Sequence, residues 1–437
     1  MNPVPPAPLL RRPAFRLLLG AQALGSAGTW MLRMATDWLV LELTGSPAAV
    51  GVLVALQFLP LLFLGPAGGL LADRHDKRRL VMGAQTATAL LAAALAAVTL
   101  TGVVTVAHLY VAATLLGVVA AVEGPARQVL VGEVAGDASL RTAVSVTNAL
   151  NQGGGLVGPA LAGLLIAEVG DGWSFGLNAL VCLAVVTLVA AMRPADLHRA
   201  APVARAPGQL REGFAYVLTR PRLAAVVVLA GLMGAFGLNG PVVYSAFAEE
   251  VWDTGARGFG LYNSLAAAGA LVGALLASRL PGLRVRTVVA GSAAFAVAET
   301  AAALVPGHAA FLAALTVVGA TTQFFLTSAV SYVQLTAAAQ VRGRVLAIYT
   351  PVLLVGHALG GLLQGRLAEE LGVRAGLAVT GALALTATAA VAAVLWWRAR
   401  TPDEVRHDRD QLRHTTGRRP DETTVPSGTT TREEPQT

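Results

Sequence analysis

Long apolar stretches fill the chain and constrain its fold more than any other feature. Twelve of them lie between about Phe15 and Trp397, each about 20 residues or longer, enough for a helix to cross roughly 30 Å of hydrocarbon. Hydrophobic residues make up 55% of the chain and charged residues only 13%, too little polar surface for a water-soluble protein of this size. The sequence therefore predicts an all-α membrane protein with twelve transmembrane helices. They are expected at residues 15–43, 48–71, 79–101, 106–127, 142–167, 173–192, 222–247, 259–278, 286–305, 309–331, 344–366 and 375–397.

Cationic residues gather in every second gap between these stretches. The gaps after the second, fourth, sixth, eighth and tenth stretches hold most of the arginines, and the other gaps hold most of the acids. Because positive loops stay on the cytoplasmic side, this pattern predicts a multi-pass protein of the cytoplasmic membrane with both termini in the cytoplasm. The net charge of +7 follows from this topology. A nucleic-acid partner is disfavoured because the basic residues are scattered over short loops.

Two short sequence echoes indicate an internal repeat. Residues 158–163 resemble residues 356–361, and residues 69–74 resemble residues 273–279 at nearly the same offset. Paired halves of this kind enclose a central path in many transporters. We therefore expect two six-helix bundles around a central cavity. The predicted divisions are a cytoplasmic N-terminal segment at 1–14, bundles at 15–192 and 222–397, a cytoplasmic linker at 193–221 and a disordered cytoplasmic tail at 398–437.

Several chemistries lack the residues that they need. Cys182 is the only cysteine, so the chain cannot form an intramolecular disulfide or a cysteine metal cluster. The sequence contains no phosphate-binding loop of the Gly-x4-Gly-Lys-Ser/Thr type, so it does not hydrolyse ATP itself. A nucleophile beside a general base is not apparent either. We expect no enzyme activity, no metal site and no cofactor.

Residues 69–78 resemble a signature of the major facilitator superfamily, often named motif A. The family pattern is Gly, three residues, Asp-Arg, one residue, Gly and two basic residues, and Asp76 stands here at the second glycine. An acid among several bases at a cytoplasmic mouth can hold helix ends together through ion pairs and helix-dipole contacts. The alternative is that the bases only set topology and meet lipid phosphate. The candidate gate residues are Gly69, Asp73, Arg74, Lys77 and Arg78.

Residues 154–163 resemble motif C, the antiporter signature of helix 5 in the same superfamily, with Ala162 in place of one glycine. Glycine lets a neighbouring helix approach closely, and proline can kink the span. The motif C residues are Gly154, Gly158, Pro159 and Gly163.

Residues 22–73 and 123–127 resemble the drug and siderophore exporter branch, which contains macrolide and enterobactin-type exporters. The resemblance covers the chain from about Arg12 to Trp397 and implies the major facilitator fold. Many drug antiporters of the family carry a proton-coupling arginine in helix 4, where this chain has Ala113. The resemblance therefore implies that proton coupling here uses other residues.

Polar residues follow one stripe of the first predicted helix. They are Gln22, Ser26, Trp30, Arg33 and Asp37. A charge deep in a span costs about 3 kcal/mol on insertion scales, so such charges tend to face an aqueous cavity. Arg33 and Asp37 are spaced i, i+4 and can pair. We expect a substrate or a gate movement that separates the pair to move a proton; the alternative is a static ion pair.

Helix 4 repeats the spacing with Glu123 and Arg127 near its cytoplasmic end. These two residues are further proton-coupling candidates, and the alternative is a gate contact without proton work. Glu299 stands alone in the ninth stretch, and we give it a lesser role because helix 9 is peripheral in the superfamily.

By the resemblance, helices 1, 4, 7 and 10 surround the central path, and all four carry polar residues here. Gly240-Pro241 is expected to break or bend the seventh span, which is tolerated where a cavity is lined. The alternative for each residue is a hydrogen bond between helices. The substrate-cavity candidates are Gln22, Ser26, Trp30, Asn239, Tyr244, Gln323 and Thr327.

The sequence and the resemblance together predict a secondary active exporter of an amphipathic small molecule, such as a drug, a macrolide-like or a siderophore-like compound. We expect proton antiport with alternating access, and hence a role in multidrug resistance. The expected partners are the small-molecule substrate, protons and membrane lipid, and the expected state is a monomer. The alternatives are a nutrient importer or facilitator of the same fold and a membrane sensor without transport.

Overall fold

The computed structural model describes residues 9–136, 139–198, 209–280, 282–338, 341–398 and Arg400. The predicted tail at 398–437 lies outside these residues except for Arg398 and Arg400, and most of the N-terminal segment does too. The chain forms two compact units, Met1–Val391 and Ala392–Thr437. In the described part of the second unit, the guanidinium of Arg400 lies 3.5 Å from the centre of the Trp396 ring.

Every regular element among the described residues is a helix. The first half contains a short 3-10 helix, η1 (Leu9–Arg11), and six long helices. These are α1 (Pro13–Thr44), α2 (Pro47–Arg74), α3 (Lys77–Leu100), α4 (Val106–Ala135), α5 (Leu140–Val169) and α6 (Asp171–Ala190). The region between the halves contains η3 (Pro194–Asp196) and α7 (Gln209–Leu218).

The second half begins with a broken helix. It contains α8 (Pro221–Gly237), α9 (Gly240–Ala246), the π-helical turn η4 (Phe247–Val251), α10 (Gly255–Ser278), α11 (Val285–Leu304), α12 (His308–Thr336), α13 (Arg342–Leu371) and α14 (Val373–Arg398). The break falls at Leu238 and Asn239, directly before Gly240-Pro241, as the sequence predicts. Proline cannot donate the backbone hydrogen bond that would continue α8.

Eleven segments of the described chain are long and apolar enough to cross a membrane, and the segment Pro221–Val251 is one of them. Helix α1, with 32 residues, is not among the eleven but lies within the first bundle against α5 and α6. It carries Arg33 and Asp37, which lower its apolar character. With α1 as the twelfth, the segments correspond to the twelve predicted spans, although most helices extend a few residues beyond the predicted bounds.

Side-chain caps fix the N-termini of two helices, α2 after the first inter-helix turn and α3 after the motif A loop. The Ser46 hydroxyl accepts a hydrogen bond from the Ala49 N–H at 3.1 Å and caps α2. The Asp76 carboxylate accepts from the Arg79 N–H at 3.0 Å and caps α3. Asp76, which replaces the family's glycine, thus starts α3 with an N-terminal cap in place of a glycine turn.

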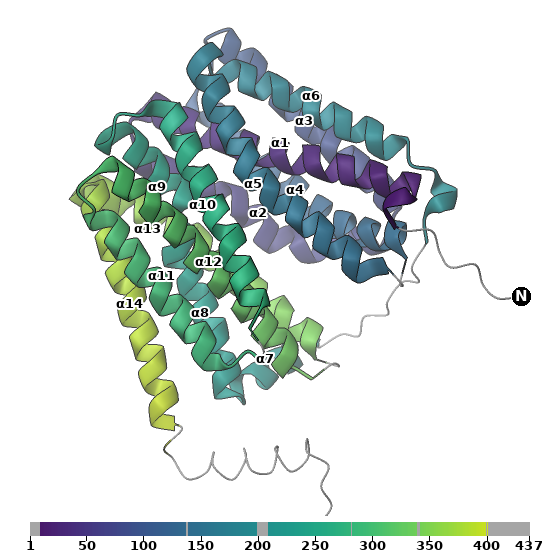
Figure 1. The fold of residues 1–437 in the computed structure, drawn as a ribbon. Coiled ribbons are helices and arrows are strands. Elements are labelled where there is room, and N and C mark those ends of the chain that lie inside the picture. Colours follow the sequence, from purple (N-terminus) through teal and green to yellow (C-terminus); the bar gives the residue numbers. More distant parts are fainter. Residues whose placement is uncertain are drawn as a thin grey trace, which may run out of the picture. The chain divides into compact units, whose positions relative to one another are not determined.

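The two halves use the same helix pairing. In the first half α1 packs against α5, α2 against α4 and α3 against α6. In the second half α8 packs against α13 and α10 against α12, while α11 meets α14 where the Ser292 and Thr388 hydroxyls lie 2.8 Å apart. Figure 1 shows the purple-to-blue helices of the first half lying together and the teal-to-green helices α8 and α10–α13 lying together. This correspondence is the structural form of the predicted repeat.

The halves contact each other through backbones that only glycine allows to meet. Helix α2 packs against α13 and α5 against α10. A Cβ at Gly51 would lie 2.8 Å from the carbonyl carbon of Gly361, and a Cβ at Gly163 would lie 2.6 Å from the carbonyl oxygen of Ala256. Lipid tails are as apolar as leucine, so helices in a membrane associate through this kind of close contact.

Polar contacts reinforce the junction at the helix ends that carry Glu168 and Glu369, which we name the acidic end. Arg257 forms an ion pair with Glu168, and the Ser46 hydroxyl donates to Glu369. One turn or more deeper, the Ser264 hydroxyl donates to the Leu156 carbonyl at 2.7 Å. These contacts join the two halves at the acidic end.

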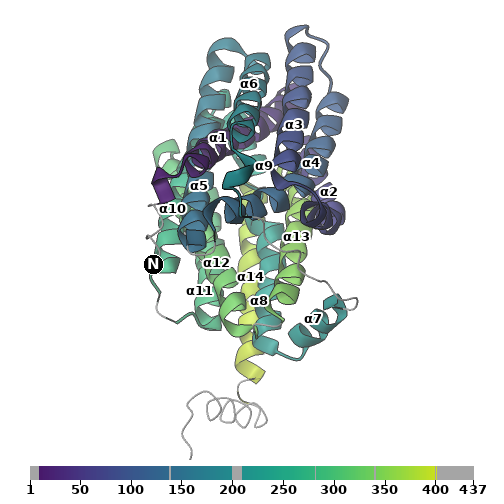
Figure 2. The same cartoon turned by 90° about the vertical axis from the view of Figure 1, so that its right-hand side faces the viewer.

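The region between the halves contains one helix that the sequence analysis did not predict. Helix α7 packs against α13 and α8, and Figure 2 shows it beside them. Glu212 on α7 forms an ion pair with Arg344, and the Tyr216 hydroxyl accepts from the Ala338 N–H at 3.1 Å. The last part of the predicted linker is therefore fastened to the second half.

We expect Gly51→Ala to lower the thermal stability of the protein in detergent. The added methyl group would press on the backbone of α13, and overpacking of this kind typically costs about 1–3 kcal/mol. Gly83→Ala is the matched control, because a Cβ at Gly83 meets nothing within 4 Å. There alanine should be neutral or raise stability by up to about 1 kcal/mol through its helix propensity. Equal melting temperatures for the two variants would contradict a backbone contact at Gly51.

Candidate transport cavity

A cavity of about 240 Å³ lies where the two halves meet. The first half lines it with Trp30, Arg33, Met34 and Asp37 from α1, Val54, Gln57 and Phe58 from α2, and Pro159 from α5. The second half contributes Leu238 and Pro241 at the break between α8 and α9, Asn263 from α10, and Leu354 and His357 from α13. The central cavity expected from the sequence is therefore present, with walls from both halves.

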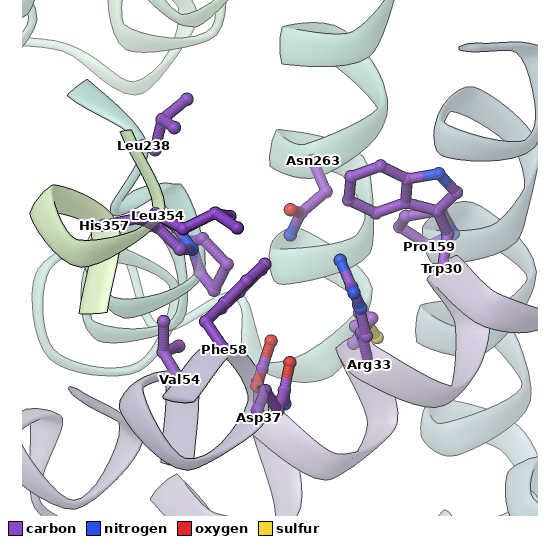
Figure 3. Close-up of a pocket in the computed structure, with 13 residues that line it drawn as sticks. Trp30, Arg33, Asp37, Val54, Phe58, Pro159, Leu238, Asn263, Leu354 and His357 are labelled. Carbon is purple, nitrogen blue, oxygen red and sulfur yellow. Dashed lines mark hydrogen bonds between the residues drawn. The ribbon is translucent and has the colours of Figure 1, made fainter. Parts of the chain in front are cut away.

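Arg33 is the cation of this cavity. Its guanidinium carbon lies 5.1 Å from the centre of the Phe58 ring and 5.7 Å from that of the Trp30 ring. Figure 3 shows Arg33 between these two aromatic side chains. Aromatic faces attract a cation, and the attraction is larger where water is excluded. Within the described residues, the Arg33 side chain has no hydrogen bond or ion pair, so its five N–H donors remain for a ligand or water.

Asp37 lies one helical turn from Arg33 and is 3% exposed. The Gln57 amide donates to one of its carboxylate oxygens at 3.4 Å, a long hydrogen bond. The pair expected between Arg33 and Asp37 does not form as a direct ion pair among the described residues. The physical reason is that each side chain has other neighbours: aromatic rings hold the guanidinium, and Gln57 holds the carboxylate. The cavity thus contains opposite charges close together but not in contact.

The wall from the second half combines an apolar break and a histidine. The Phe58 and His357 rings meet edge to face, with centroids 4.3 Å apart. His357 is buried, and its Nδ1 has no hydrogen-bond partner among the described residues. The amide nitrogen of Asn263 donates to the Phe259 carbonyl at 2.9 Å, and its side chain lines the cavity. The wall therefore offers polar groups to a bound molecule on an otherwise apolar surface.

The polar stripe of α1 divides between two environments. Trp30, Arg33 and Asp37 line the cavity, as expected. Gln22 and Ser26 are not among its lining residues, so their place in a substrate path stays a prediction. The Ser26 hydroxyl donates to the Gln22 and Leu150 carbonyls at 2.7 and 3.1 Å, which fixes it against α5. The helix is long enough that its first turns lie against the bundle while its middle faces the other half.

Glu123 and Arg127 form the ion pair that their spacing predicts, inside the first half. The Gln85 amide donates to the Glu123 carboxylate at 2.7 Å, and Arg127 donates to the Gln22 side-chain oxygen at 3.2 Å. Four side chains from three helices thus form one polar network. In it the two charges satisfy each other and the amides satisfy part of the remaining hydrogen-bonding capacity.

The motif A residues lie at the ends of α2 and α3. Gly69 is partly buried in the last turns of α2, and Asp73 and Arg74 end that helix. Lys77 forms an ion pair with Glu133 of α4 at 3.6 Å. Arg78 donates to the Val189 carbonyl at 2.9 Å and to the Ala190 carbonyl at the end of α6. In this structure Lys77 and Arg78 therefore fasten helices of the first half to one another.

The motif C glycines place α5 between two neighbours. A Cβ at Gly154 would lie 2.6 Å from the Ser26 hydroxyl oxygen, and one at Gly158 would lie 3.1 Å from the Met31 nitrogen. Gly163 faces α10 of the other half, as described above, and Pro159 lines the cavity. The close approach expected of these glycines is present on both sides of α5.

The remaining cavity candidates are not among the residues that line this cavity. The Asn239 amide donates to the Ala235 carbonyl at 2.7 Å, so it closes the end of α8. Gln323 donates to the Thr327 hydroxyl at 3.2 Å along α12, and Tyr244 lies on α9; none of the three lines this cavity. Their role in substrate binding therefore stays a prediction, because helical spacing alone does not show which neighbour a face meets. Glu299 is buried in α11.

The sequence analysis missed Gln57, Asn263 and His357 as cavity residues. Each is a polar residue in the middle of an apolar span, which is the signal that could have singled it out. The substrate-cavity candidates were chosen from helices 1, 4, 7 and 10 of the resemblance, whereas these three residues lie on α2, α10 and α13. Among the described residues, no group of three or more His, Cys, Asp or Glu side chains could hold a metal ion.

Comparison with known proteins assigns the chain to a family. The profile of the family MFS_3, described as "Transmembrane secretion effector", matches residues 4–417. The chain belongs to this family of the major facilitator superfamily. It is therefore a membrane transporter and not an enzyme.

Two curated relatives and one solved structure illustrate the likeness of this transporter to others. It is 30% identical over 240 residues to the uncharacterized MFS-type transporter YfiS of Bacillus subtilis, covering 52% of this chain and 54% of YfiS. It is 26% identical over 293 residues to the enterobactin exporter EntS of Escherichia coli, covering 65% of this chain and 69% of EntS. The match thus spans about half the length of YfiS. The crystal structure of nucleoside transporter NupG has a TM-score of 0.69 at 13% identity, covering 88% of this chain and 98% of NupG, and shows the shared fold.

We expect Glu123 and Arg127 to be energetically coupled within the folded transporter. Removing either partner alone, as Glu123→Gln or Arg127→Met, leaves a charge of the network without its counter-charge, whereas the double variant leaves none. The coupling energy should be about 1–3 kcal/mol, measured as a double-mutant cycle of unfolding in mixed detergents. The exposed pair Arg257–Glu168 is the matched control and should show less than about 1 kcal/mol. Additive single-variant effects at Glu123 and Arg127 would contradict the network.

Proposed function

We propose that this transporter exports an amphipathic small molecule from the cytoplasm by proton antiport. The observation that carries the proposal is the cavity between the halves, in which Arg33 and Asp37 stand beside Trp30 and Phe58. Two comparisons support export: the family is described as secretion effectors, and a relative is named an enterobactin exporter. The aromatic and apolar walls favour cargo with an apolar face, and the charged pair favours cargo with polar groups.

We assign the acidic end to the outside of the cytoplasmic membrane and the arginine-rich end to the cytoplasm, following the charge of the loops. The contacts of Arg257 with Glu168 and of Ser46 with Glu369 then close the cavity on the outside. In this proposal the structure represents the inward-facing state of the transporter. Lys77 and Arg78 of motif A bind within the first half here, and they are free to exchange partners when the cytoplasmic ends of the two halves close.

Asp37 is the group at which cargo and proton compete. As a carboxylate it accepts hydrogen bonds from cargo entering from the cytoplasm, together with the Gln57 amide. When the cavity opens outward, a proton on Asp37 removes the negative charge of that acceptor, weakens its hydrogen bonds to the cargo and releases it. The membrane potential and the pH gradient supply the energy, with no cofactor.

Arg33 gives the return step a direction. With Asp37 ionised, the two charges sum to zero; with Asp37 protonated, the charge of Arg33 remains alone. A net positive charge is drawn toward the negative cytoplasm by about 2.3 kcal/mol per 100 mV. The proton-loaded cavity therefore favours the inward-facing state, and with an uncharged cargo one net charge moves in per cycle. We propose that one chain, surrounded by lipid, completes this cycle as a monomer.

We expect Asp37→Asn to abolish proton-driven transport although the variant protein still folds. The measurement is uptake of ethidium into everted membrane vesicles, followed by fluorescence, with and without an uncoupler. Asparagine keeps the shape of the side chain but cannot take up a proton, so the uptake that the uncoupler abolishes in the parent should fall to background.

Asp253→Asn is the matched control for this experiment. Asp253 lies in the turn before α10 with a φ of 46°, a conformation that asparagine adopts readily, and it is far in sequence from the cavity helices of the first half. Uptake by Asp37→Asn equal to the parent would remove Asp37 from the mechanism. Parent uptake that ignores the uncoupler would overturn antiport, and ethidium accumulation in right-side-out vesicles instead would favour the importer alternative.

We expect reporter fusions to show that the C-terminus lies on the cytoplasmic side of the membrane. Green fluorescent protein fused after Thr437 should fluoresce and alkaline phosphatase at the same point should be inactive, because the former folds in the cytoplasm and the latter outside it. The reciprocal fusion after Val169, at the acidic end of α5, should give active phosphatase. The opposite pattern would invert the topology and with it the direction assigned to transport.

A further inference from the structure

A second cavity lies inside the first half and meets the transport cavity at two residues. It has a volume of about 70 Å³ and is lined by residues of α1, α2, α3, α4 and α6. Arg33 and Gln57 line both cavities. Glu123 and Gln85 line the second cavity but not the transport cavity. The two cavities are therefore neighbours that share one wall.

The walls of the second cavity are suited to water. A water molecule occupies about 30 Å³ in the liquid, so the volume is sufficient for about two, provided that polar groups bind them. Thr29, Thr36, Thr88, Gln57 and Gln85 are among its lining residues. The three threonine hydroxyls donate to backbone carbonyls and can still accept a hydrogen bond from water. The side-chain oxygen of Gln85 is buried and has no hydrogen-bond partner among the described residues. An unsatisfied buried acceptor beside a polar cavity is the usual setting of an ordered water.

Polar groups border the second cavity toward both carboxyl groups. Asp37 binds Gln57 at 3.4 Å, Gln57 and Gln85 both line the second cavity, and Gln85 binds Glu123 at 2.7 Å. Glu123 in turn pairs with Arg127. The ionisable groups that face the second cavity are Arg33, Glu123 and Cys182. Amide side chains do not themselves relay protons readily, so the waters are the element that would connect the two carboxyl groups.

We propose that the second cavity is a water-filled branch through which the proton passes between Asp37 and Glu123, separately from the path of the cargo. This inference rests on the proposed antiport. In the step, Asp37 gives its proton to a water, the water gives one to the next, and the last gives one to the Glu123 carboxylate; the bonds formed and broken are all O–H bonds. The positive charge of Arg33 disfavours a standing hydronium ion beside it, so the transfer runs along already hydrogen-bonded water.

A separate proton branch has a functional consequence. If proton and cargo left by the same opening, an empty cavity would let protons leak through. With the branch, the proton reaches Glu123, one turn from Arg127 near the arginine-rich end, while the cargo occupies the transport cavity between the halves. The Glu123–Arg127 pair can then release the proton to the cytoplasm when motif A and α4 change their contacts.

Cys182 provides a built-in reporter of water in the branch. It lines the second cavity, is the only cysteine of the chain, and donates its S–H to the Asn178 oxygen at 3.6 Å. Its S–H stretching band in the infrared is therefore unique in the protein, and Cys182→Ser assigns it. After transfer of the purified protein to D2O, we expect the band to disappear rapidly in the parent, because water reaches the thiol without unfolding.

Ala120→Val tests the branch without touching an ionisable group. Ala120 lines the second cavity, and the two added methyl groups would take the place of water. We expect S–H exchange to slow by about tenfold or more, because exchange then needs local opening of the helices. Proton-driven ethidium uptake should fall by about tenfold or more, while ethidium binding to the purified protein is kept. Ala93→Val, on the exposed face of α3, is the control and should behave as the parent.

A second pair of variants covers the case in which Ala120→Val does not fold. Thr88→Val removes a hydroxyl from the cavity without adding volume, and Thr86→Val makes the same change on the exposed face of the same helix. Each hydroxyl donates to a carbonyl four residues earlier, so their local hydrogen bonding is matched. Thr88→Val should slow S–H exchange and proton-driven uptake, and Thr86→Val should change neither.

The outcomes separate the two proposals. Slow S–H exchange in the parent, with uncoupler-sensitive uptake intact, would overturn the branch and leave the antiport standing. Ala120→Val and Thr88→Val variants that fold and transport like the parent would do the same. Parent uptake that does not respond to the uncoupler would overturn the antiport and with it the proton role of the branch.

Discussion

Close contact between helix backbones is the constraint on which this transporter depends. In hydrocarbon a helix gains little from burying leucine against leucine, because lipid offers the same surroundings. Small residues at the crossings let dispersion and weak polar contacts act over the length of the helices instead. Gly51 against Gly361 and Gly163 against Gly260 bring α2 to α13 and α5 to α10. These two crossings set the distance between the halves, and the cavity is the space that remains beside them.

Two charged pairs of the first half have the same i, i+4 spacing, but only one of them forms an ion pair. Glu123 and Arg127 form an ion pair with amides on both sides, so their charges are held within the structure. Arg33 and Asp37 are separated, and each has a side that faces the cavity. The aromatic rings around Arg33 lower the cost of its burial without using its N–H donors. Glu123 and Arg127 are suited to passing on a proton from a fixed position. Arg33 and Asp37 are suited to binding cargo and a proton in turn during a transport cycle.

The sequence predicted much of the fold and a smaller share of the site. The twelve spans, the break before Pro241 and the packing of the motif C glycines each follow from a local property: length and apolarity, the missing N–H of proline, or the missing side chain of glycine. Arg33 and Asp37 were expected to face a cavity because charges are costly in a span, and Trp30 was expected there because it shares their helical stripe. Gln22 and Ser26 share their helical stripe but lie against Arg127 and α5. Helical spacing gives the face of a residue, and the neighbour of that face depends on the other helices.

By itself the sequence determined that this chain crosses a membrane, where its helices break and which charges are buried, since hydrophobic length, proline and the cost of desolvation act locally along the chain. The tertiary structure alone decided which helices line the cavity, that Gln57 and not Arg33 binds Asp37, and that Gln57, Asn263 and His357 belong to the site. It also placed a second cavity beside the first. These features depend on side chains from helices far apart in the sequence, and their distances are fixed only when the glycine crossings bring the helices together.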